Sequence, residues 1–80
     1  MKLYPDKEKL IELAHYRIPF GKFKGRYLVD LPEAYLIWFK RKGFPQGKLG
    51  SLLNAMLEIK KNGLEPLIRK VQKDFPDHKV

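Results

Sequence analysis

Apolar residues recur at helical spacing in three stretches of the C-terminal part of the chain, and each stretch ends at a residue that stops a helix. The first runs from Asp30 to Lys42 before Gly43, the second ends at Asn62-Gly63, and Pro76 closes the third. Spacings of three and four residues place side chains on one face of an α-helix. This pattern predicts three helices whose buried faces are, in chain order, Leu31, Tyr35, Trp38 and Phe39; Leu49, Leu52, Leu53, Met56 and Ile59; and Leu64, Leu67, Ile68, Val71 and Phe75.

The segment before these helices has a different character. Asp6 can cap a short first helix that ends near Ala14, but the residues that follow have no helical period. We expect a β-hairpin with arms Tyr16–Phe20 and Arg26–Leu28 around a turn at Gly21–Gly25, because glycine reaches φ angles that other residues avoid. The predicted fold class is therefore α+β and predominantly α: an N-terminal helix, a short β-hairpin, then three packed helices.

The length and composition indicate one small folded unit. We expect a single domain over residues 1–80, with 1–4 and 76–80 as candidates for disordered ends. There is no cysteine, and His15 and His78 lie far apart, so we expect no disulfide, no metal site and no cofactor. The N-terminal residues lack the apolar core of a signal peptide, and no apolar run reaches the length of a membrane span, which predicts a cytoplasmic protein.

The chain is strongly basic, with 17 Lys and Arg against 9 Asp and Glu. Half of its net charge of +8 comes from residues 16–29, which contain four cations and no acid. Such an excess favours polyanionic partners, namely nucleic acid, an acidic protein face or an anionic membrane surface. The alternative is that the cations only keep a small protein in solution.

The cations of the predicted hairpin are the main candidates for a binding site. Lys22, Lys24 and Arg26 are two residues apart and would point the same way along an extended segment. Cations on a glycine-bounded turn can follow a phosphate backbone, and Phe23 or Tyr27 can stack on an unpaired base. Alternatively, the aromatic residues dock the hairpin onto the helices and the lysines only solvate its outer face. The candidate nucleic-acid-binding residues are Arg17, Lys22, Phe23, Lys24, Arg26, Tyr27 and Lys48.

Lys48 follows Gly47 at the start of a predicted helix, where free backbone N–H groups and the helix dipole favour a phosphate. The surrounding sequence is not a P-loop, because Gly43 and Gly47 are one residue too close and Leu49 replaces the Ser or Thr. We expect at most an accessory phosphate contact here, and a tight turn between helices explains the glycine better. Trp38 lies on the predicted buried face of its helix and is expected in the core.

No arrangement of catalytic residues is visible in the sequence. Asp30 and Glu33 are explained by their places at the start of a helix, where acids complement the helix dipole. The sequence contains no Ser/His/Asp set, no HExxH motif and no carboxylate cluster of the nuclease type. We therefore expect a protein that is not an enzyme.

Three runs of residues resemble a known family. They are Pro19-Phe20-Gly21-Lys22-Phe23-Lys24-Gly25-Arg26, then Leu31-Pro32-x-x-Tyr35-Leu36-x-Trp38-Phe39, and Gly43-Phe44-Pro45-x-Gly47-Lys48-Leu49-Gly50. Over about residues 17–68 the chain resembles short bacterial proteins of unknown function labelled "putative quorum-sensing-regulated virulence factor". The family's hallmark aromatic is often Tyr or His where this chain has Phe23, which cannot hydrogen-bond a ligand. Related F-G-K-x-K-G cassettes occur in exonuclease- and helicase-like proteins, so the resemblance implies a link to nucleic acid but no chemistry.

Two hypotheses of function follow. The first is a small non-catalytic module that binds nucleic acid, as single strands or through backbone contacts, with the basic hairpin. The second is a protein-interaction adaptor or a regulatory protein, whose hairpin meets an acidic protein partner and whose apolar helix edges meet another chain, including a second copy. The hypotheses differ in whether Phe23 faces solvent, where it can stack on a base, or the core.

Overall fold

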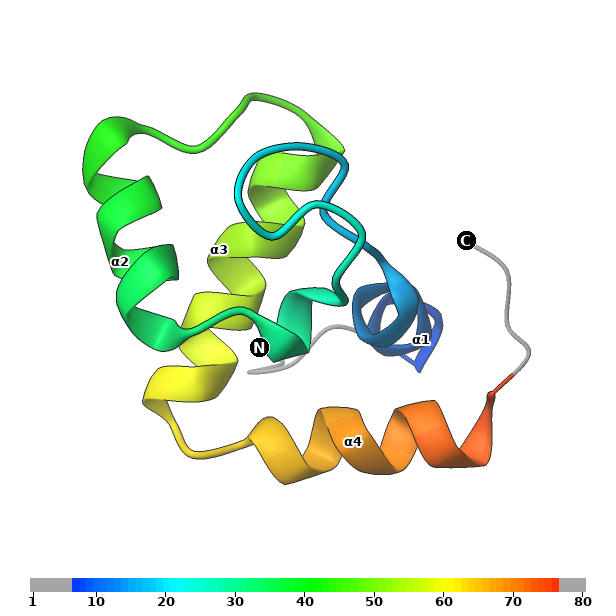
Figure 1. The fold of residues 1–80 in the computed structure, drawn as a ribbon. Coiled ribbons are helices and arrows are strands. Elements are labelled where there is room, and N and C mark those ends of the chain that lie inside the picture. Colours follow the sequence, from blue (N-terminus) through cyan, green and yellow to red (C-terminus); the bar gives the residue numbers. More distant parts are fainter. Residues whose placement is uncertain (1–6, 77–80) are drawn as a thin grey trace.

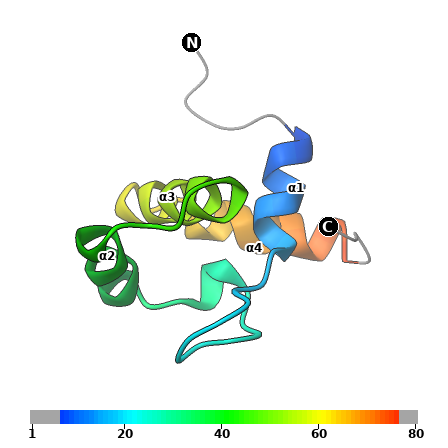
Figure 2. The same ribbon diagram turned by 90° about the horizontal axis from the view of Figure 1, so that it is seen from above.

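The computed structural model describes residues 7–76 and places four α-helices and one short 3-10 helix in that range (Figure 1). The elements are α1 (Lys7–His15), the 3-10 helix η1 (Leu28–Asp30), α2 (Glu33–Lys42), α3 (Lys48–Lys61) and α4 (Glu65–Asp74). Helix α1 packs against α4, α2 packs against α3, and η1 contacts α1, α3 and α4. The loop between α1 and η1 projects to one side of the helices (Figure 2).

The helices predicted from the apolar spacing are confirmed. Helix α2 ends at Gly43, and α3 ends at Asn62-Gly63, with φ angles of 106° at Gly43 and 69° at Gly63. Such angles favour glycine, which is why these residues predicted the helix ends correctly. The predicted cap at Asp6, the residue His78 and the proposed disordered ends at 1–4 and 76–80, apart from Pro76, lie outside the described residues.

The predicted fold class, α+β with a β-hairpin, is wrong. Residues 7–76 form no β-strand, so the described part of the chain is all-α. The predicted arms do approach each other, but they share one isolated antiparallel bridge, between Arg17 and Tyr27. The bridge is made by two backbone hydrogen bonds, from Ile18 N–H to the Arg26 carbonyl at 2.9 Å and from Leu28 N–H to the Tyr16 carbonyl at 3.1 Å. One more bond joins the arms, from Gly25 N–H to the Ile18 carbonyl at 2.8 Å. We call residues 16–27 the basic loop.

Proline and glycine prevent the two arms from becoming strands. The hydrogen bonds between the arms end at Ile18, and Pro19, whose ring fixes φ at about −65°, leads the chain directly into the turns. Gly21 and Gly25 adopt φ angles of 80° and 88°, and the residues between them wind into successive turns. On the other arm, Leu28 N–H still donates to the Tyr16 carbonyl, but η1 begins at this residue and the pairing ends there. Too few residues remain on either side to form paired strands.

The core lies between α1, α3 and α4, with η1 at its centre. Leu28 and Val29 of η1 are fully buried, and so is Leu31 directly after it. Most of the predicted inward residues of α3 are buried, and so is Ile68 of α4. The prediction that Phe75 belongs to the buried face of α4 is wrong, because this ring is 36% exposed and follows the last residue of the helix. The other predicted residues are partly buried, namely Leu49, Leu64, Leu67 and Val71. Leu28 and Leu31 are three residues apart, and a 3-10 turn places side chains at this spacing on the same side.

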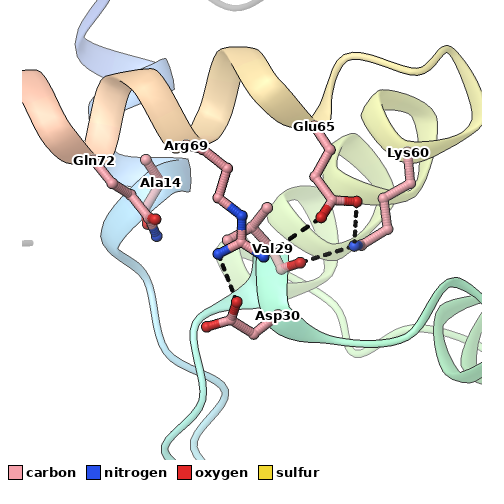
Figure 3. Close-up of polar contacts among 7 residues, drawn as sticks. All are labelled: Ala14, Val29, Asp30, Lys60, Glu65, Arg69 and Gln72. Atoms are coloured by element: carbon pink, nitrogen blue, oxygen red, sulfur yellow. Dashed lines mark hydrogen bonds and ion pairs between the residues drawn. The ribbon is translucent and has the colours of Figure 1, made fainter.

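Polar contacts fasten η1 to the helices around it (Figure 3). Lys60 of α3, whose side chain is only 7% exposed, donates to the Val29 carbonyl at 2.8 Å and pairs with Glu65 of α4 at 3.0 Å. Arg69 of α4 pairs with Asp30 at 2.6 Å. The nearly buried Lys60 ammonium is tolerated because both a carbonyl and a carboxylate accept its protons.

The pairing of Asp30 corrects a sequence prediction. Asp30 does not cap α2, because that helix begins at Glu33, directly after Pro32, and has no side-chain cap hydrogen bond. Its carboxylate contacts Arg69 instead and joins the η1 turn to α4 (Figure 3). Glu33 does lie in the first turn of α2, as the sequence predicts.

Candidate functional site

Aromatic contacts fix the basic loop to α2. The Phe23 ring packs edge-on against Tyr35, with 4.8 Å between ring centroids, and the Phe20 ring packs against Phe39 at 6.0 Å. Gly21 permits this close approach, because a Cβ at that position would lie 3.3 Å from the Tyr35 hydroxyl. The aromatic residues of the loop therefore dock it onto the helix, as one of the two sequence interpretations expects.

The two rings considered for base stacking are both in contact with other protein groups. Phe23 is partly buried and lies against Tyr35. Tyr27 is covered by Arg17, whose guanidinium lies 4.6 Å from the ring centroid and donates to the Tyr27 hydroxyl at 3.1 Å. The ring of His15 meets Tyr27 edge-on at 6.4 Å. Contacts within the protein therefore already occupy part of each of these rings.

Lys22, Lys24 and Arg26 are exposed on the basic loop. The segment they occupy forms turns, so the extended alignment that the sequence suggested does not exist. The Lys22 ammonium lies 5.6 Å from the centroid of the Phe23 ring. Within residues 7–76, no carboxylate lies at ion-pair distance from any of the three cations. They present positive charge that the described part of the protein does not neutralise.

Lys48 lies at the start of α3, as predicted, but its ammonium contacts the Glu12 carboxylate of α1. This hydrogen bond raises the pKa of Lys48 above its ordinary value, against a smaller opposing effect of desolvation. Glu12 places a negative charge beside the N-terminus of α3, where a bound anion would otherwise approach. The structure thus gives Lys48 a partner within the fold.

Trp38 is exposed over 52% of its surface, so the prediction of a core tryptophan is wrong. Leu36 is the fully buried residue of α2, and at 100° per residue Trp38 lies about 160° around the helix from it. The Trp38 ring stacks on Tyr35, with 5.8 Å between centroids and 25° between planes. We call Phe23, Tyr35 and Trp38 the aromatic row.

The aromatic row has a cation at each end. Lys22 lies over Phe23, and at the other end the Lys42 ammonium lies 5.9 Å from the centroid of the Trp38 ring. Lys42 belongs to the basic last turn of α2, where cations complement the helix dipole. The row therefore connects the basic loop with the basic end of α2.

The described part of the chain shows no metal-binding cluster, since no three His, Asp or Glu side chains gather there in a suitable group. In the same range, no helix combines the length and the apolar character needed to cross a membrane.

Comparisons with known proteins identify relatives. Residues 6–71 match the model of the family described as "Putative quorum-sensing-regulated virulence factor". The "Uncharacterized protein YpeB" of Escherichia coli strain K12 is 54% identical over 69 residues, which are 85% of this chain and 96% of that protein. The protein of the same description from E. coli O157:H7 matches equally well. No solved structure matches the chain.

The chain belongs to this family of "Putative quorum-sensing-regulated virulence factor" proteins, as the motifs from Pro19 to Gly50 suggested. The match is wider than those motifs and includes α1 and most of α4. The names of these relatives state no activity, so the comparisons show the family of the chain but no chemistry.

Proposed function

We propose that the protein is a small non-catalytic module that binds nucleic acid, as single strands or through the phosphate backbone. The basic loop is the primary contact. The observation that supports this proposal is the exposure of Lys22, Lys24 and Arg26, which have no carboxylate partner in residues 7–76. Phosphate groups can supply the missing negative charge.

The distribution of ion pairs strengthens this argument. Glu12, Asp30, Glu65 and Asp74 pair with lysines and arginines of α3 and α4. None of these pairs involves the basic loop, so its positive charge is not neutralised locally. A few phosphate contacts of this kind support modest affinity, about 10⁻⁴–10⁻⁶ M at physiological salt, with a strong salt dependence.

Two of the cations that the sequence suggested have secondary roles in this proposal. Arg17 is exposed but holds Tyr27 and also donates to the Gly25 carbonyl at 3.5 Å, so it shapes the loop. Lys48 contacts Glu12 and would have to leave that carboxylate to meet a phosphate. We therefore assign the phosphate contacts to Lys22, Lys24 and Arg26.

Fluorescence anisotropy of a labelled single-stranded oligonucleotide, titrated over a series of salt concentrations, tests the proposal. Replacing Lys22, Lys24 and Arg26 by Ala should reduce the slope of log K against log salt by about 2, since each phosphate contact on a single strand contributes about 0.7. The matched control replaces Lys61, Lys70 and Lys73, which are exposed on α3 and α4, and removes the same charge. Equal slopes for the two triple variants would refute the basic loop as the site.

A protein-interaction adaptor is the second candidate function. It is favoured by the exposure of Ile37 and Trp38 on α2, because large apolar side chains at the surface often mark protein contacts. In that case the basic loop would meet an acidic partner. Binding that is tighter for polyglutamate than for the oligonucleotide, and that weakens when Lys22, Lys24 and Arg26 are replaced, would favour this function over the first.

A further inference from the structure

The outer face of α2 carries a row of apolar and cationic residues that lie outside the core. Ala34, Ile37, Trp38, Arg41 and Lys42 follow the spacing i, i+3, i+4, i+7, i+8 along the helix and line a shallow open groove of about 550 Å³. This volume lies in the range of about 300–1,000 Å³ typical of small-molecule sites. The lining is apolar at one end and cationic at the other, and contains no acid.

We propose that this groove is a nucleotide subsite. An unpaired base stacks on Trp38, and the phosphates beside it contact Arg41 and Lys42. This inference rests on the proposed function and narrows it, because a stacked base must be free of its complementary strand. The partner is then single-stranded nucleic acid, and Trp38 rather than Phe23 or Tyr27 is the stacking residue.

The environment of Trp38 suits this role. Its ring stacks on Tyr35 and contacts Phe39 at 6.1 Å, so neighbouring rings hold it in place while 52% of its surface stays open. A ring that is already ordered loses little conformational entropy when a base covers it. Every base offers a flat π face, so such stacking needs no particular sequence.

The positive charges around the groove favour an anionic ligand. Arg41 and Lys42 are exposed and, within residues 7–76, neither pairs with a carboxylate. A second copy of this chain would bring another protein of net charge +8 against them, which disfavours a homodimer through this face. A phosphate next to a stacked base satisfies both the cations and the exposed ring.

The groove also continues the proposed loop site. Through the aromatic row, Lys22 and Phe23 of the loop connect with Trp38 and Lys42 of α2, and each step of this series measures 4.8–5.9 Å. A short single strand can therefore contact the loop cations with some phosphates and the groove with a base. Single-strand sites of about 4–16 nucleotides are typical of modules that combine cations with aromatic rings.

Trp38 is the single tryptophan of the chain, so its fluorescence reports the groove directly. The protein is titrated with four probes: a thymidine oligonucleotide of about 12 nucleotides, its duplex with the complementary strand, heparin and polyglutamate. We expect the single strand to quench Trp38 strongly. Heparin, which has charge but no bases, should bind with little quenching, and the duplex should behave like heparin.

Replacing Trp38 by Leu should weaken single-strand binding by about fivefold to a hundredfold in anisotropy, the range that one stacked base provides, and leave heparin binding unchanged. Phe75→Leu, a change at another exposed ring at the end of α4, is the matched control. If Trp38→Leu does not fold, the double variant Arg41→Gln/Lys42→Gln should reduce the quenching by the single strand. The control for that variant is Lys61→Gln/Lys73→Gln.

The outcomes separate this inference from the proposed function. Unchanged single-strand affinity in Trp38→Leu, or equal quenching by heparin, overturns the subsite and leaves the loop proposal standing. Quenching by polyglutamate at least as strong as that by the oligonucleotide also overturns it, because the groove would then prefer an acidic peptide. If the wild-type protein binds neither oligonucleotide nor heparin, the proposed function fails and the subsite fails with it.

Discussion

The two sides of this small protein differ in whether their charged side chains form ion pairs. Around η1, α3 and α4, acids and bases meet, as in the contacts of Asp30 with Arg69 and of Glu65 with Lys60 (Figure 3). On the basic loop and the outer face of α2, cations lie beside exposed aromatic and aliphatic side chains and, in the described residues, without carboxylate partners. We call these the paired side and the open side.

The difference indicates which side stabilises the fold and which side is available to a partner. On the paired side, removing one group leaves a buried or half-buried partner unsatisfied, which costs stability. On the open side, Trp38, Arg41 and Lys22 can change without leaving such a partner behind, so their presence is not explained by folding. The variants below test this division, in order of decreasing expected effect.

The largest effect is expected in the core beneath the paired side. Leu28 of η1 is fully buried, and Leu28→Ala should lower the free energy of unfolding by about 2–5 kcal/mol, through lost burial and a cavity. Ile37 on the open side is 39% exposed, so Ile37→Ala should cost less than about 1 kcal/mol. Urea unfolding followed by circular dichroism measures both. A cost at Ile37 close to that at Leu28 would mean that the outer face of α2 is buried in solution.

A smaller effect is expected from the ion pairs themselves. Arg69→Met removes contacts with Asp30 at 2.6 Å and Glu65 at 3.4 Å, and because these side chains are partly exposed it should cost about 1 kcal/mol. The control, Lys70→Met, breaks a more exposed pair with Asp74 on one helix and should cost less than about 0.5 kcal/mol. The same unfolding measurement compares them. Neither change should alter the salt dependence of oligonucleotide binding, and a change with Arg69→Met would place part of the binding surface on the paired side.

The helices were predictable from sequence because their signals are local. Apolar spacing identified α2, α3 and α4, and Gly43 and Gly63 marked helix ends through φ angles that glycine adopts most easily. The basic loop also carries a local signal against a regular strand, Pro19, because proline within sheets is confined to edges, first positions and bulges.

The buried face of α2 was harder to predict, because this helix has apolar residues on two sides. Tyr35 and Phe39 face the loop and core, whereas Ile37 and Trp38 line the outer groove, and both sets fit a helical period. Which side is buried depends on where α3 and the basic loop pack, and that information is not local. The contacts of Lys48 with Glu12 and of Arg69 with Asp30 are likewise invisible in sequence, since their partners lie on different elements.

The smallest effect is expected at Lys48, the candidate cation that the fold pairs with an acid. Its pKa in the folded protein is raised above the ordinary value of 10.5, chiefly by the hydrogen bond to Glu12. A lysine whose pKa is higher in the folded than in the unfolded protein stabilises the fold. This stabilisation is complete at pH values below the unfolded-state pKa, and it is lost as the pH rises through the folded-state pKa. The wild-type protein should therefore have a higher free energy of unfolding than Glu12→Gln, and this difference should be larger at about pH 8 than at about pH 11.5. Urea unfolding at both pH values measures this difference. A difference that stays the same at the higher pH would show that Glu12 does not hold the Lys48 ammonium. Lys48 would then be one of the unpaired cations of the open side.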